Sequence, residues 1–122
     1  MSERYDVVVV GAGNAAFCAA QAARERVERV LMLEKAPEEW IGGNSYFTAG
    51  AFRVTFGGLQ DLRPLLDEVD EDMLGRTELP AYEVADFMAD MRRVTEGRCD
   101  PELARVMVED SADTVRWLAD IA

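Results

Sequence analysis

A chain of 122 residues that is 49% hydrophobic and 30% charged is long enough for one small domain with a hydrophobic core. Its net charge of −11 argues against nucleic acid or anionic lipid as a partner, and its lack of histidine argues against a zinc site. No segment approaches the roughly 18 apolar residues of a membrane span, and the first residues have no secretory character, so we expect a cytoplasmic protein.

The first predicted element is a β-strand that leads directly into a glycine-rich turn. The consecutive valines of 7–10 favour a parallel strand that is buried on both faces. Gly11 allows a sharp turn, Gly13 lacks the Cβ that would keep a pyrophosphate from the backbone, and Ala16 takes the third small position. By itself this turn is weak evidence, because a strand–turn–helix without any ligand has the same pattern.

An alanine-rich helix over residues 14–25 and a second strand near 29–34 follow the turn. The amides and dipole of the helix N-terminus would face phosphates. Glu34 lies 23 residues after Gly11, close to the roughly 20 expected for a ribose-binding acid, and its carboxylate would repel a 2′-phosphate. These elements predict a βαβ unit with parallel strands, a right-handed crossover and a dinucleotide ligand.

A second glycine motif, Gly42-Gly43-Asn44-Ser45, points to a flavin rather than a nicotinamide. A nicotinamide-binding module would explain the motif from Gly11 to Glu34 but not this one. We expect the amides of residues 13–15 to face the pyrophosphate, Glu34 to bind the adenosine ribose, and residues 42–45 and 49–50 to line the flavin side. The predicted cofactor-binding residues are Gly11, Ala12, Gly13, Asn14, Ala15, Ala16, Glu34, Lys35, Ala36, Gly42, Gly43, Asn44, Ser45, Thr48, Ala49 and Gly50.

The second half of the chain predicts helices. A weak acidic helix over Leu59–Leu74 is interrupted near Pro64, and another, with its apolar residues between Val84 and Val94, ends at Gly97. Asp100 is a predicted N-cap with Pro101 at the first helical position of a helix that runs to the C-terminus. Its predicted buried face comprises Leu103, Met107, Ser111, Val115, Leu118 and Ala122. Ser111 there is more typical of a hydroxyl bonded to the backbone than of a catalytic group.

We divide the chain into residues 1–58, which carry the cofactor motifs, and an acidic helical segment, 59–122, of the same incomplete domain. The first part holds 7 acids and 6 bases, and the second holds 17 acids and 7 bases. A negative pyrophosphate would thus bind in the nearly neutral part. The acidic part is more typical of a solvated helical surface than of a docking patch. Cys18 and Cys99 lack metal-ligand spacing, and we expect reduced, packed thiols rather than a disulfide.

With these motifs in place, residues 4–58 resemble the flavin-binding segment of the fumarate reductase/succinate dehydrogenase flavoprotein family, and most of all its soluble tricarballylate dehydrogenase branch. The resemblance rests on Glu34-Lys35-Ala36, on Gly42-Gly43-Asn44-Ser45 and on Thr48-Ala49-Gly50. Ala51 departs from it, because many members have glycine there. The segments 100–103 and 111–118 resemble the helical region that follows in the family, so the likeness covers nearly the whole chain.

The resemblance implies a partial Rossmann-like FAD-binding domain of an oxidoreductase that interconverts alkene and alkane forms of a small di- or tricarboxylate. Family members are several times longer, so we assign no catalytic residue and expect the 122-residue chain alone to be inactive. Membrane-bound relatives link flavin to a histidine where Asn44 stands here, so FAD should be held non-covalently. The alternatives are a nicotinamide-binding module and a non-catalytic fragment that self-associates.

Overall fold

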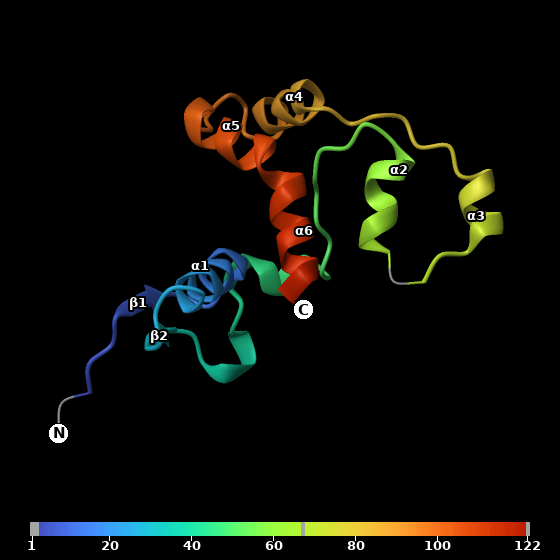
Figure 1. Ribbon diagram of the computed structural model, residues 1–122. Helices are drawn as coiled ribbons and strands as arrows, with labels where there is room; N and C mark the ends of the chain where they lie inside the picture. Colours follow the sequence, from blue (N-terminus) through green and yellow to red (C-terminus); the bar gives the residue numbers. More distant parts are fainter. Residues whose placement is uncertain (1–2, 67, 122) are drawn as a thin grey trace. The chain divides into compact units, whose positions relative to one another are not determined.

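The computed structural model describes residues 3–66 and 68–121, and the chain divides into two compact units, Met1–Phe52 and Arg53–Ala122. The first unit contains β1 (Val7–Val10), α1 (Asn14–Arg24), β2 (Val30–Leu33) and the 3₁₀ helices η1 (Glu38–Trp40) and η2 (Gly43–Phe47). The second contains α2 (Leu59–Leu62), the 3₁₀ helix η3 (Arg63–Leu65), α3 (Glu71–Arg76), α4 (Val84–Val94), α5 (Pro101–Glu109) and α6 (Ser111–Ile121) (Figure 1).

The first unit is built on a βαβ arrangement. β1 and β2 pair in parallel, with Val7 opposite Val30 and Val10 opposite Leu33, and α1 packs against both strands. The pairing continues past β1, because the amide of Gly11 donates to the carbonyl of Leu33 at 2.6 Å. The predicted α/β fold with parallel strands and an intervening helix is therefore confirmed.

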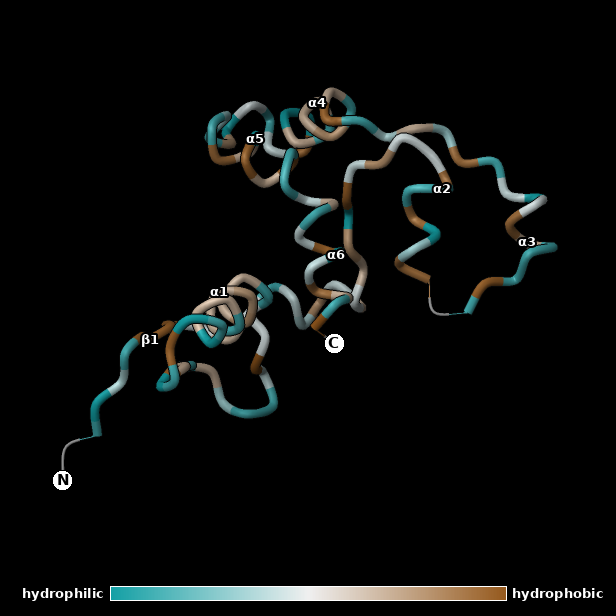
Figure 2. The backbone as a smooth tube through the Cα atoms, viewed as in Figure 1, coloured by the Kyte–Doolittle hydropathy of each residue, from teal (hydrophilic) through white to brown (hydrophobic). Residues whose placement is uncertain are grey.

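The valines of β1 are less buried than their sequence predicts. Val8 is 51% exposed and Val10 is 83% exposed, so the expected burial on both faces is wrong for this structure. The described residues form a sheet of only two strands, in which β2 pairs with one edge of β1 and α1 supplies the cover. β1 is hydrophobic (Figure 2), and its exposed valines consequently present apolar surface to solvent.

In the second unit, α3, α4 and α5 begin at side-chain caps. Asp100 accepts hydrogen bonds from the amides of Glu102 and Leu103 at 2.9 and 3.1 Å, which confirms the predicted N-cap of α5. α4 begins with a capping box, in which Glu83 and Asp86 bond to each other's backbone amides. The segment after residue 58 is broken into α2, η3 and α3, and Pro64 lies in η3 as the interruption expected near it.

The predicted helix from Pro101 to the C-terminus is in fact two helices. α5 ends at Glu109 and α6 begins at Ser111, whose hydroxyl donates to the carbonyl of Val108 at 2.8 Å and accepts from the amide of Thr55 at 3.1 Å. The expectation that the Ser111 hydroxyl bonds to the backbone is confirmed. Hydroxyls that bond back to a carbonyl one turn earlier compete with regular helical hydrogen bonds, in keeping with the break at this position.

The buried face of α5 is displaced by one residue from the predicted one. Ala104 and Val108 are buried, whereas Leu103 and Met107 are 70% and 46% exposed. α5 packs against α4, where Phe87 is buried, and the small side chain of Ala104 suits a close approach of the two helices. Ala122, the last residue of the predicted face, lies outside the described residues.

Buried apolar side chains are few in the described part of the chain: Ala12 and Ala20 in the first unit, and Phe87, Ala104 and Val108 in the second. The single core that the composition led us to expect is therefore thin and divided. Cys18 and Cys99 are free thiols, each partly exposed rather than packed. Within the described ranges, the helices are too short or too polar to cross a membrane.

Candidate cofactor-binding site

The turn after β1 is held to the end of β2 by backbone hydrogen bonds. Gly11 has a φ of +117°, a backbone angle that residues with a side chain rarely adopt, so this position favours glycine. Its amide donates to Leu33, and the next amide, that of Ala12, donates to the carboxylate of Glu34 at 2.8 Å. The turn and the predicted ribose-binding acid are therefore adjacent.

The Glu34 carboxylate is held by three backbone amides. One oxygen, Oε2, accepts from Ala12, while Oε1 accepts from Lys35 and Ala36 at 2.8 Å each. These bonds, that from Ala36 first and that from Ala12 second, lower the pKa of Glu34, so the group is charged at neutral pH. A carboxylate oxygen can accept more than one hydrogen bond, and Oε2 accepts only that from Ala12, so an oriented anionic acceptor remains available for a diol such as a ribose.

The N-terminus of α1 carries several unused hydrogen-bond donors. Gly13 is the N-cap residue and has no side chain to cap the helix; its carbonyl accepts from Phe17 at 3.1 Å. None of the described residues accepts a hydrogen bond from the amides of Gly13, Ala15 or Ala16. Free amides at a positive helix end are suited to a phosphate group.

The second glycine motif lies directly on this turn. Gly42 and Gly43 have φ values of +120° and +54° at the start of η2, and η2 contacts the start of α1. The hydroxyl of Ser45 accepts from the amide of Asn14 at 3.0 Å. A Cβ on Gly13 would stand 3.2 Å from the carbonyl oxygen of Gly42. The two motifs, far apart in the sequence, thus form one local structure.

The predicted residues divide into those the structure brings together and those it does not. The turn 11–16, the segment 34–36 and the motif 42–45 meet through the contacts described above. Thr48 joins them indirectly, because its hydroxyl donates to the carbonyl of Ser45 at 2.9 Å. Ala49 and Gly50 have φ values of +52° and +74° and, like Asn44, form no hydrogen bond with residues 11–16 in the described structure.

Sequence reasoning placed Ser45 on the flavin side and missed its bond to the first turn. Serine is a common helix-capping residue, but caps are sought immediately before a helix, not 31 residues after its first residue. Sequence reasoning also missed an aromatic cluster of Trp40, Tyr46 and Phe47, whose ring centroids lie 5.1 to 6.3 Å apart. All three side chains are more than half exposed.

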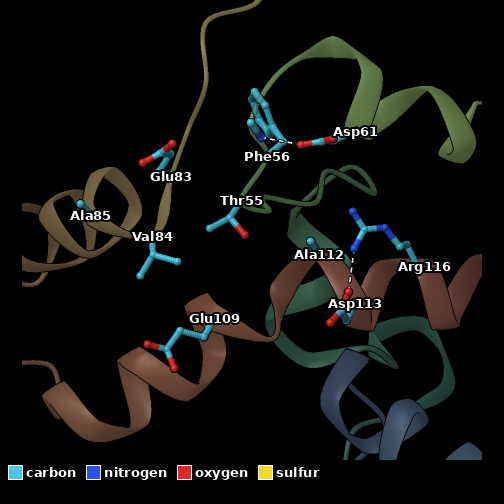
Figure 3. A pocket seen from close by; sticks show the side chains of 11 residues that line it. Thr55, Phe56, Asp61, Glu83, Val84, Ala85, Glu109, Ala112, Asp113 and Arg116 are labelled. Atoms are coloured by element: carbon cyan, nitrogen blue, oxygen red, sulfur yellow. Dashed lines mark hydrogen bonds and ion pairs between the residues drawn. The ribbon is translucent and has the colours of Figure 1, made fainter.

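The second unit contains a cavity of about 730 Å³ that includes none of the predicted cofactor-binding residues (Figure 3). Its lining includes the acidic residues Asp61, Glu83, Glu109 and Asp113 and the basic residue Arg116. Asp113 and Arg116 form an ion pair of 2.6 Å, and Asp61 accepts from the amide of Gly57 at 2.7 Å. An acidic lining of this kind disfavours a pyrophosphate.

Comparison with known proteins gives a match over nearly the whole chain. Residues 6–121 match the family model described as FAD binding domain. The chain is 31% identical to a probable fumarate reductase, Ifc3, of Shewanella frigidimarina. The alignment spans 120 residues, which are 98% of this chain and 18% of that protein. It is 30% identical to the vinyl phenol reductase of Lactiplantibacillus plantarum, over 97% of this chain and 20% of that protein.

A urocanate reductase of Eggerthella lenta is also 30% identical, over 93% of this chain and 16% of that protein. The chain therefore spans about a fifth or less of the length of the curated relatives it matches. No solved structure gives a significant match.

Proposed function

The chain belongs to the family of FAD binding domains, and on that premise we propose that residues 11–50 hold FAD non-covalently. The amides of Gly13, Ala15 and Ala16 would bind the pyrophosphate, and Glu34 would bind the adenosine ribose. The segment from Gly42 to Gly50 would line FAD from its pyrophosphate to its flavin ring.

One observation carries this proposal. Free amides at the start of α1 and the charged carboxylate of Glu34 lie on the same turn, because Ala12 donates to Glu34 at 2.8 Å. A dinucleotide presents a diol next to a pyrophosphate, so its adenosine half matches an anionic acceptor beside a set of amide donors. A 2′-phosphate would meet the negative charge of Glu34, which disfavours cofactors that carry one.

For the longer protein we propose hydride transfer that interconverts an alkene and an alkane in a small di- or tricarboxylate, of the fumarate reductase or tricarballylate dehydrogenase type. The support is the identity of about 31% with a probable fumarate reductase and the motifs of the tricarballylate dehydrogenase branch. FAD, when bound, supplies the hydride acceptor or donor. Residues 1–122 would contribute cofactor binding and no catalytic side chain.

Two rival functions make different predictions. A nicotinamide-binding module would use the turn and Glu34 but would not need the second glycine motif against Gly13. A non-catalytic fragment would bind no cofactor and would associate through its exposed apolar surface, which includes Val8 and Val10 of β1. FAD binding is favoured because the family match includes the second motif.

An absorption spectrum of the purified chain after incubation with FAD and gel filtration tests the proposal. Flavin bands that elute with the protein would support it, whereas a nicotinamide band in the protein as purified, or no band with either cofactor, would favour a rival. Ala15→Asp is the informative variant. An acid in the first turn favours the helix dipole but repels a pyrophosphate, so the variant should fold and lose flavin. Ala15→Ser, which adds a polar group without charge, should retain flavin.

A further inference from the structure

We propose that Ser45 is a positioning residue that fastens the second glycine motif to the first turn before any cofactor binds. Its hydroxyl would act through the amide of Asn14, so the part of the site that follows the pyrophosphate is already formed in the cofactor-free chain. This inference rests on the proposed FAD site and adds an internal organisation to it.

The hydrogen bond between Ser45 and Asn14 serves both segments. The first amide of α1 needs an acceptor, and Gly13, the residue in the capping position, has no side chain to provide one. Ser45 provides it at 3.0 Å from a position 31 residues later. The same bond anchors the second motif, because the half-buried Ser45 lies within η2. This short helix begins with two residues of positive φ, Gly42 as its cap and Gly43 as its first residue.

The backbone makes a second contact between the same segments. A Cβ on Gly13 would come within 3.2 Å of the carbonyl oxygen of Gly42, tighter than an ordinary contact. The neighbouring atom belongs to the backbone and cannot rotate away as a side chain would. Glycine at position 13 therefore suits the protein's own packing as well as the proposed phosphate, and a methyl group there should displace residue 42 by a few tenths of an ångström even without cofactor.

The hydrogen bond acts on Ser45 and the close contact on Gly42, the cap of η2, and these two residues are themselves joined by a hydrogen bond. The amide of Ser45 donates to the carbonyl of Gly42 at 3.0 Å, and the amide of Thr48 donates to the carbonyl of Ser45 at 3.2 Å. Release of Ser45 from Asn14 should therefore weaken the hydrogen bonds of the whole segment 42–48. Faster amide exchange in that segment is the direct sign of such a release.

Hydrogen exchange of the cofactor-free chain, followed by mass spectrometry, tests the proposal. Ser45→Ala and Gly13→Ala should both speed exchange in residues 42–48, and Ser45→Thr, which keeps a hydroxyl, should exchange like the original chain. Circular dichroism checks that α1 and the other helices persist in each variant. Unchanged exchange in Ser45→Ala would overturn the proposal whatever the cofactor does.

Binding of FAD and of ADP distinguishes positioning from direct contact. ADP carries the ribose and pyrophosphate but no flavin. Ser45→Ala should raise the dissociation constant of FAD about three- to tenfold, which corresponds to the net free energy of one hydrogen bond. The dissociation constant of ADP should stay nearly unchanged. An equal loss of affinity for FAD and for ADP would indicate that Ser45 contacts the phosphates directly and would overturn its positioning role. If the original chain binds neither ligand, the proposed function fails, and the exchange result still decides the role of Ser45.

Discussion

The carboxylate of Glu34 accepts a hydrogen bond of 2.8 Å from the amide of Ala12, which lies 22 residues earlier in the chain. This bond joins the end of β2 to the turn that follows β1. It orients the proposed ribose-binding acid by means of the proposed phosphate-binding turn, so the protein backbone sets the two parts of the proposed dinucleotide site in relation to each other.

Glu34→Gln should lower FAD affinity about tenfold or more, because a carboxamide has only one acceptor oxygen. In either orientation its NH₂ group would face backbone amides that now donate to the carboxylate, those of Ala12 or of Lys35 and Ala36. Titration followed by flavin fluorescence measures the effect. Glu38→Gln, which removes an acid from η1, is the matched control and should bind normally; equal affinity in both variants would contradict the role of Glu34.

Asp90 should make the stability of the second unit depend on pH. Hydrogen bonds from Arg93 and then from the Tyr82 hydroxyl lower the pKa of Asp90, with a further contribution from the charge of Arg53. Its stabilising contribution is therefore complete above the ordinary aspartate pKa of about 3.9 and is lost as the pH falls through the lower folded-state pKa.

Asp90→Asn should consequently unfold at lower denaturant concentration than the original chain at pH 7, and the difference should shrink as the pH falls below about 3.9. Urea denaturation at a series of pH values measures it. Asp120→Asn, an exposed position near the end of α6, serves as control. A difference for Asp90→Asn that grows toward low pH would have the wrong sign and refute this account.

Self-association of the 122-residue chain should depend on the uncovered face of β1. Val10 is 83% exposed, so Val10→Lys should preserve the fold while it places a charge on the apolar surface. Sedimentation velocity should show less dimer or larger species for this variant than for the original chain. Leu103→Lys, at a position 70% exposed on α5, is the control and should associate as the original chain does.

FAD bound to residues 1–122 should come free when the protein is denatured. The chain contains no histidine, so a histidyl link to the flavin cannot form within residues 1–122. Filtration after denaturation should leave the flavin in the filtrate, and a denaturing gel should show no fluorescent band. Fluorescence that stays with the polypeptide would point to a link through another side chain, such as Cys18.

The isolated chain should not reduce fumarate-like acids with reduced viologen dye. It spans 18% of the probable fumarate reductase it resembles, and a flavin-type site needs a cap that excludes water and positions the acid. An assay at saturating FAD should therefore show no turnover above a protein-free blank. Turnover that Glu34→Ala abolishes would show instead that residues 1–122 form a complete site.

The sequence by itself determined the elements whose signals are local. Consecutive valines, a glycine-rich turn and an alanine-rich helix specify β1 and α1, because strand and helix preferences act over a few neighbouring residues. Asp100 before Pro101 likewise specified the start of α5, since a cap and its amides lie within one turn. The spacing from Gly11 to Glu34 placed the acid at the strand end.

Only the tertiary structure decided how distant segments meet. The bond from Asn14 to Ser45 and the approach of Gly42 to Gly13 depend on the path of the chain through β2, which no local pattern encodes. The same holds for the break before Ser111, which coincides with its bond to Thr55, and for the one-residue shift of the buried face of α5. Burial is a property of what packs against a residue, so four valines predict a strand but not whether another layer covers it.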